Sequence, residues 1–319
     1  MSKRALDNLS DFIFETKYRD IPTEIVERAS DCILDVIGSA VAGRSQSSTR
    51  AIQTVIQNHS NSGPSSIWFS KESSNAISAA TINSMAATSL DIDDGHRMAA
   101  GHPGAAIISS ALATAQETKA TIADTICSIV LGYQAAVSVA LARYERYNNS
   151  TVSGRWSGIG ASVARSKLLE LSSSEISQSI LIAEQHAPRV SSAMHHGFAG
   201  SDVKEGIAWS VLSGMYASDL SVLGFRGYPD TFEQNILYNP KVIKKSIKNF
   251  NAIHGLFFKP YACCRWIHSA IDGLLFIMNT NKLSKHKAFS AMYPARNETP
   301  LSLLDIQFSF GHCTISEIN

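Results

Sequence analysis

The chain has 319 residues, of which 45% are hydrophobic and 17% charged, so it can bury a substantial core in one or two domains. Its formal net charge of +1, without any lysine- and arginine-rich run, argues against a nucleic-acid partner. Five cysteines without paired spacing fit a reducing compartment, so we expect a cytoplasmic protein, with a mitochondrial location as the alternative. We also expect no membrane association, because we find neither a signal-type opening segment nor an uncharged stretch long enough to cross a bilayer.

Helical periodicity begins at the start of the chain. Apolar residues recur at steps of three and four over 5–16 and again over 22–43. A shorter helix is expected over 51–58. A helix made largely of small residues is expected over 75–90.

The remaining helices follow without intervening strands. They are expected over 105–115, 121–147, 158–171, 175–187, 206–223 and 259–278. Because strands do not alternate with helices, a doubly wound sheet is excluded and we predict a mostly α fold. From about residue 279 the helical pattern weakens.

Ionisable residues are concentrated in one short stretch between two apolar helices. Within twelve residues lie Asp91, Asp93, Asp94, His96 and His102. Buried charges are costly unless they are paired or used, so this stretch is where we expect chemistry. A divalent-metal site is one interpretation of such a set, and a solvated helix cap is the alternative for a single aspartate. His102, in a stiff Gly-His-Pro-Gly bend, suits general acid or base catalysis, with a structural histidine as the alternative.

A second polar stretch runs from Lys259 to His268. On a helix beginning near Pro260, Tyr261, Arg265 and His268 would share one face. Such a cationic and phenolic face suits a carboxylate-rich small molecule, and an ordinary surface helix is the alternative.

A third polar cluster precedes the helix expected at 206. It contains Lys204, which would contact a substrate anion at a helix N-terminus. The alternative is a surface lysine without a role.

Together, and in this order, these stretches resemble the MmgE/PrpD family, which includes 2-methylcitrate dehydratases and cis-aconitate decarboxylases. The matching motifs lie at 20–26, 33–38, 91–94, 102–104, 158–169, 214–227, 259–268 and 305–309. The resemblance implies a large all-helical domain with a smaller α/β lid domain, assembled as a homodimer. It also implies chemistry without a cofactor or bound metal, on a small polycarboxylate substrate. We therefore assign 1–278 to the helical catalytic domain and 279–319 to a remnant of a lid that is largely missing.

The family's site residues are carried over by position. The resemblance implies catalytic roles for Asp91, His102, Lys204 and His268, and substrate-binding roles for Asp94, His96, Lys259, Tyr261 and Arg265. Two positions depart from the family pattern, with Gly95 in place of a frequent threonine and Asn148 in place of a histidine.

The resemblance leads us to expect a lyase that removes water from a tricarboxylic acid, in the manner of a 2-methylcitrate dehydratase. Decarboxylation of a cis-aconitate-like acid, or epimerisation or isomerisation of a dicarboxylate, are alternatives on the same scaffold. Because the lid is expected to be largely absent, a catalytically impaired relative that serves as a binding or dimerisation partner is a further alternative.

Overall fold

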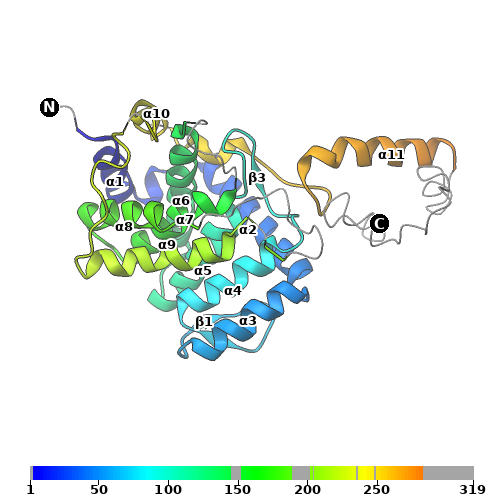
Figure 1. The fold of residues 1–319 in the computed structure, drawn as a ribbon, viewed down its shortest axis with the longest axis horizontal. Coiled ribbons are helices and arrows are strands. Elements are labelled where there is room, and N and C mark those ends of the chain that lie inside the picture. The colour runs from blue at the N-terminus through cyan, green and yellow to red at the C-terminus, as the bar shows by residue number, and fades with distance from the viewer. Residues whose placement is uncertain are drawn as a thin grey trace.

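The computed structural model describes residues 3–144, 152–188, 202–203, 205–234, 236–247 and 249–282. Its helices are α1 (Ala5–Glu15), α2 (Thr23–Gly43), α3 (Ser47–His59), α4 (Ala76–Thr88), α5 (Gly104–Thr118), α6 (Ile122–Ala142), α7 (Ser157–Leu168), α8 (Ser173–Gln185), α9 (Ile207–Val222), α10 (Pro240–Ser246) and α11 (His268–Thr280). Its strands are β1 (Ser65–Ser66), β2 (Ser73–Ser74), β3 (Gly95–His96) and β4 (Leu256–Phe257). The helices form a bundle, with α11 set apart from it (Figure 1). The mostly α prediction is confirmed.

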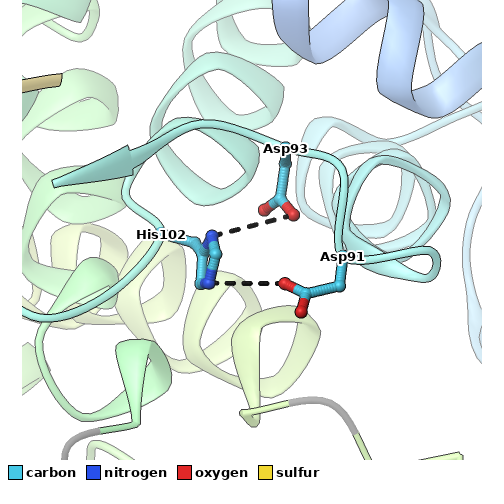
Figure 2. Close-up of side chains that lie close together, drawn as sticks. All are labelled: Asp91, Asp93 and His102. Atoms are coloured by element: carbon cyan, nitrogen blue, oxygen red, sulfur yellow. Dashed lines mark ion pairs between the residues drawn. The ribbon is translucent and has the colours of Figure 1, made fainter. Parts of the chain in front are cut away.

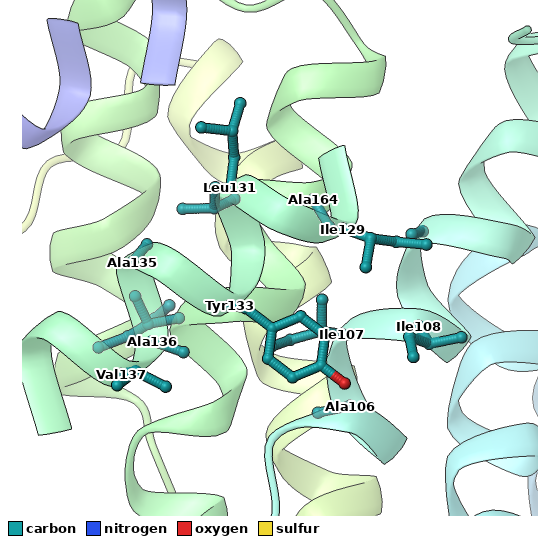
Figure 3. Close-up of a cluster of buried hydrophobic side chains, with 14 of the residues drawn as sticks. Ala106, Ile107, Ile108, Ile129, Leu131, Tyr133, Ala135, Ala136, Val137 and Ala164 are labelled. Carbon is teal, nitrogen blue, oxygen red and sulfur yellow. The ribbon is translucent and has the colours of Figure 1, made fainter. Parts of the chain in front are cut away.

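The centre of the bundle is built from helices rich in small residues. Every residue of α4 is buried, so this helix is enclosed by its neighbours on all sides. A Cβ atom on Gly132 of α6 would lie 2.9 Å from the carbonyl oxygen of Gly160 on α7, and one on Gly214 of α9 would lie 2.2 Å from that of Gly158. These glycines allow the helix backbones to approach closely, and a cluster of buried hydrophobic side chains that includes Ile107, Ile129 and Leu131 fills the core between the helices (Figure 3).

Helix α6 corrects one expectation from the sequence. It is long and apolar enough to cross a bilayer, which the sequence reading did not recognise. In the structure, however, 89% of its most apolar window is buried among other helices. This burial is typical of the central helix of a folded bundle.

A two-residue antiparallel ribbon joins segments that are far apart in the chain. Gly95 of β3 pairs with Phe257 of β4, and His96 pairs with Leu256. The side chain of Arg28 on α2 donates to the Leu256 carbonyl oxygen at 2.8 Å and so anchors the ribbon to the bundle. The ribbon brings the segment that follows β4 alongside the loop between α4 and α5.

The helix predicted from about residue 260 begins later than expected. A turn in which the Cys263 amide donates to the Tyr261 carbonyl at 2.9 Å replaces its first part. A 3-10 turn, η7 (Arg265–Ile267), follows, and α11 begins only at His268. Tyr261, Arg265 and His268 therefore do not share one helix face, and that prediction is wrong.

Candidate active site

Asp91, His102 and Lys259 meet between the bundle and the β3–β4 ribbon. Nζ of Lys259 donates to the Asp91 carboxylate oxygen Oδ1 at 2.6 Å and also to the Asp91 carbonyl oxygen. Nε2 of His102 lies 3.4 Å from the same Oδ1 atom (Figure 2). The Lys259 side chain is completely buried, whereas those of Asp91 and His102 keep 12% and 13% of their surface exposed. Two of the three groups are thus accessible to a small molecule.

Asp91 has an unusual backbone at the end of α4. Its φ is +56°, in the left-handed region, and its amide donates to the Thr88 carbonyl oxygen at 3.1 Å. Aspartate tolerates this conformation better than most residues because its short polar side chain bonds locally. The turn directs the carboxylate toward His102 and away from the helix that precedes it (Figure 2).

The ring of His102 is fixed at one of its two nitrogens. Nδ1 lies 2.7 Å from the carbonyl oxygen of Asp94, and a carbonyl can only accept, so Nδ1 carries a proton. The His102 amide donates to Oγ of Ser153 at 2.7 Å, which holds the bend from the other side. Nε2 is left as the atom that can exchange a proton with a bound molecule.

Asp94 was predicted to bind substrate, but its carboxylate faces protein groups. Oδ1 accepts the Gly104 amide at 2.9 Å, and Oδ2 accepts the Tyr133 hydroxyl at 2.9 Å. Burial, reinforced by the nearby charges of Asp93 and Asp35, raises the pKa of Asp94 to about 8. A carboxyl enclosed in this way shapes the loop before α5 and contributes its backbone carbonyl to His102.

Asp93 and Asp35 complete a group of carboxylates behind His102. Asp93 is fully buried, and neither of its carboxylate oxygens accepts a hydrogen bond from any residue that the structure describes. Oδ1 of Asp93 lies 3.9 Å from Nδ1 of His102. Burial and the charge of Asp93 raise the pKa of Asp35, on α2, to about 6. Sequence reasoning gave Asp35 no role in the site, although this residue lies within the matching motif at 33–38, 56 residues before Asp91.

Glu205 is a second residue that sequence reasoning missed. Its Oε1 atom lies 3.8 Å from Nε2 of His102, and its Oε2 atom accepts the amide and the hydroxyl of Ser153. A single carboxylate therefore reaches both the ring of His102 and the serine that holds its backbone. The one feature of the sequence that could have pointed to Glu205 is its position directly after Lys204. Lys204 itself lies outside the residues that the structure describes.

The other predicted site residues lie at the edge of this centre or beyond it. His96 is a buried residue of the ribbon itself, with its Nδ1 atom accepting the Ala99 amide at 3.0 Å. The Arg265 guanidinium stacks over the ring of Phe257 at 5.3 Å, next to the ribbon. Tyr261 and His268 pack edge to face at 5.3 Å, and the Tyr261 hydroxyl donates to Asp272 of α11. Only Lys259 of the second stretch contacts the aspartate–histidine centre in the described part of the chain.

Asp91, Asp93 and His102 also have the side-chain types of a cation site, with candidate ligand atoms within 4.8 Å of one another. Two of these groups already have partners in the fold, however. The ammonium of Lys259 supplies a positive charge at Asp91, and the Asp94 carbonyl occupies Nδ1 of His102. At Asp91, therefore, the ammonium of Lys259 already supplies the positive charge that a cation would bring.

A family model describes the region that contains this centre. The model for the MmgE/PrpD N-terminal domain matches residues 7–248, about three quarters of the chain. The chain belongs to the MmgE/PrpD family. The match includes Asp91, His102 and Glu205, and ends before Lys259.

Two curated relatives extend the comparison. A cis-aconitate decarboxylase-like protein, oryM, of Aspergillus oryzae is 22% identical over 291 residues, covering 83% of this chain and 60% of the relative. The cis-aconitate decarboxylase of Aspergillus terreus is 25% identical over 279 residues, covering 80% of this chain and 56% of the relative. The chain thus spans less than two thirds of the length of either relative.

Proposed function

We propose that this MmgE/PrpD protein is a lyase acting on a small tricarboxylic acid. The observation that carries the proposal is the meeting of Asp91, His102 and Lys259, which combines a partly exposed proton-transfer group with a buried ammonium. A positioned histidine that is hydrogen-bonded at one nitrogen and open at the other is suited to general acid–base catalysis. The proposal needs no cofactor, because these side chains can themselves transfer a proton and stabilise charge.

The substrate's own charge sets a requirement on the site. Asp91, Asp93 and Glu205 surround His102, so the described part of the centre holds more carboxylates than cations. A tricarboxylate needs cations to offset this repulsion. We assign that role to Lys204, which directly precedes Glu205 in the chain, and to Arg265 at the ribbon.

Two eliminations fit this arrangement, and we place loss of carbon dioxide first. In that reaction the bond to one carboxylate carbon breaks, its electron pair remains on the substrate, and Nε2 of His102 delivers a proton to the carbon. The relatives named as cis-aconitate decarboxylases favour this reaction. In loss of water, favoured by our sequence analysis, a base removes a C–H proton while the departing hydroxyl receives one.

One assay distinguishes these reactions. Purified protein is incubated with cis-aconitate, citrate or 2-methylcitrate, while released carbon dioxide and the absorbance of unsaturated acids are followed. We expect carbon dioxide from cis-aconitate, and a loss of activity of about 100-fold or more in His102→Ala. His59→Ala, which alters an exposed histidine on α3, is the matched control and should retain full activity.

The other outcomes also have defined meanings. An unsaturated product from 2-methylcitrate without carbon dioxide would assign a dehydratase. Exchange of substrate protons with solvent without net product would assign an epimerase or isomerase. No turnover or exchange with any acid would contradict the lyase proposal and favour a binding or dimerisation partner.

We also propose that the protein is a homodimer, as the family resemblance implies. Light scattering coupled to size-exclusion chromatography tests this directly. A mass near twice the 34.5 kDa of one chain is expected, and a mass of one chain would contradict the proposal.

A further inference from the structure

The buried carboxylate of Asp93 has no structural partner that explains it. Its side chain is fully enclosed, and neither oxygen accepts a hydrogen bond from the described residues. An ionised carboxylate without hydrogen bonds is strongly disfavoured in a protein interior. Asp94, next to it, is also buried but is satisfied by an amide and a hydroxyl. Asp93 therefore lowers the stability of the fold, which is typical of groups retained for function.

The nearest charged partner of Asp93 is the ring of His102. Figure 2 shows Asp93 and Asp91 each facing one ring nitrogen. Oδ1 of Asp93 lies 3.9 Å from Nδ1, whose proton is directed to the Asp94 carbonyl oxygen. At this distance a buried carboxylate attracts positive charge on the ring.

We propose that Asp93 is a positioning residue for His102. Its buried charge stabilises the ring when Nε2 holds a proton, and keeps Nδ1 turned toward the loop that follows α4. The effect of Asp93 on catalysis rests on the proposed function. The electrostatic coupling between Asp93 and His102 does not, because it exists without substrate. Asp93 acts on the reaction only through His102 and does not itself contact the reacting atoms.

The remaining groups around His102 act on its other side or through neighbours. Asp91, Glu205 and Lys259 approach from the Nε2 side, with Lys259 acting through Asp91. Ser153 of η3 (Ser153–Arg155) holds the His102 backbone. Asp93 is thus the one carboxylate on the Nδ1 side within 4 Å among the described residues.

The test uses Asp93→Asn, which removes the charge and preserves the shape. Glu184→Gln is the control, because it removes another buried carboxylate, one that pairs with Arg155 and makes no ion pair with His102 among the described residues. We expect Asp93→Asn to raise the melting temperature, because an unsatisfied buried charge is lost. If Asp93 only supported the fold, the substitution would lower the melting temperature instead. Failure of both Asp93→Asn and Asp93→Ser to fold would overturn the proposal.

The decisive readout needs no substrate. Diethyl pyrocarbonate modifies neutral imidazole, and peptide mapping follows His102 alone. At pH 6 we expect His102 to react about tenfold faster in Asp93→Asn than in the wild type, and at a rate within twofold of the wild type in Glu184→Gln. An unchanged rate in Asp93→Asn would overturn the proposal.

Turnover then separates this inference from the proposed function. In Asp93→Asn we expect kcat to fall about 10- to 100-fold with KM within threefold, and the alkaline limb of the pH profile of the decarboxylation, where His102 acts as the acid, to move to lower pH. A changed modification rate in a protein inactive on every acid would refute the lyase and retain the coupling. If Asp93→Asn keeps the kcat and the pH profile of an active wild-type lyase, the coupling between Asp93 and His102 has no role in catalysis.

Discussion

Lys259 and Asp91 form a buried ion pair across 168 residues of chain. The pair joins the segment after β4 to the loop after α4, and it shares its Asp91 oxygen with His102. Lys259 has no exposed side-chain surface, so its charge is compensated only by protein groups. The same contact therefore stabilises the ribbon and sets the charge of the proposed centre.

Removing one partner of this pair should cost more than removing both. In Lys259→Met the Asp91 carboxylate loses its ammonium, and we expect the free energy of unfolding to fall by about 3–5 kcal/mol. Asp91→Asn combined with Lys259→Met should be less destabilised than Lys259→Met alone, because no unpaired charge remains. Urea unfolding of the wild type, both single variants and the double variant measures this coupling. Additive losses would show that the pair is not coupled.

The raised pKa of Asp94 predicts a pH dependence of stability. The folded state keeps the Asp94 proton up to about pH 8, whereas the unfolded chain releases it near 3.8. Its contribution is therefore fully present below about pH 4, falls as pH rises, and levels off above pH 8.

Asp94→Asn should remove this dependence. Asparagine cannot ionise, and it can still accept the Gly104 amide and meet the Tyr133 hydroxyl. We expect similar melting temperatures for variant and wild type near pH 4, and a variant that is increasingly more stable toward pH 8. Melting curves at one-unit steps measure the difference. A difference that is constant with pH would show that Asp94 does not hold its proton in the folded state.

The space beside Gly95 is the basis of a third prediction. A Cβ atom on Gly95 would lie 2.4 Å from the ring of Phe257, so the threonine frequent in the family does not fit here. Gly95→Thr should separate β3 from β4 and lower both melting temperature and activity. Gly95→Thr with Phe257→Ala should recover part of the loss, because the ring is then absent. If the second change adds further damage, the ribbon is not limited by this contact.

The sequence was sufficient for most of the helices, because their apolar residues recur with helical spacing and their ends carry ordinary signals. It did not predict α10, and it placed the start of α11 too early. It also located Asp91 and His102, since their residue types are unusual between apolar helices. It could not show that Glu205 and Asp35 join them, because those contacts depend on how α2 and α9 pack. It misplaced Tyr261 and His268, because Pro260 was taken as a helix start when a turn follows it.

The proposed chemistry should not depend on a metal ion. Asp91, Asp93 and His102 have suitable ligand types, but the Lys259 ammonium lies 2.6 Å from Asp91 and would repel a divalent cation. We expect turnover after dialysis against EDTA to equal that of untreated protein, with no gain on adding Mg²⁺, Mn²⁺ or Zn²⁺. Lys259→Met is the informative companion, because removing the ammonium opens the same carboxylate to a cation. Metal-dependent thermal stabilisation in Lys259→Met but not in the wild type would show that the lysine takes the place of an ion. Loss of wild-type activity in EDTA, restored by one of these metals, would contradict this assignment.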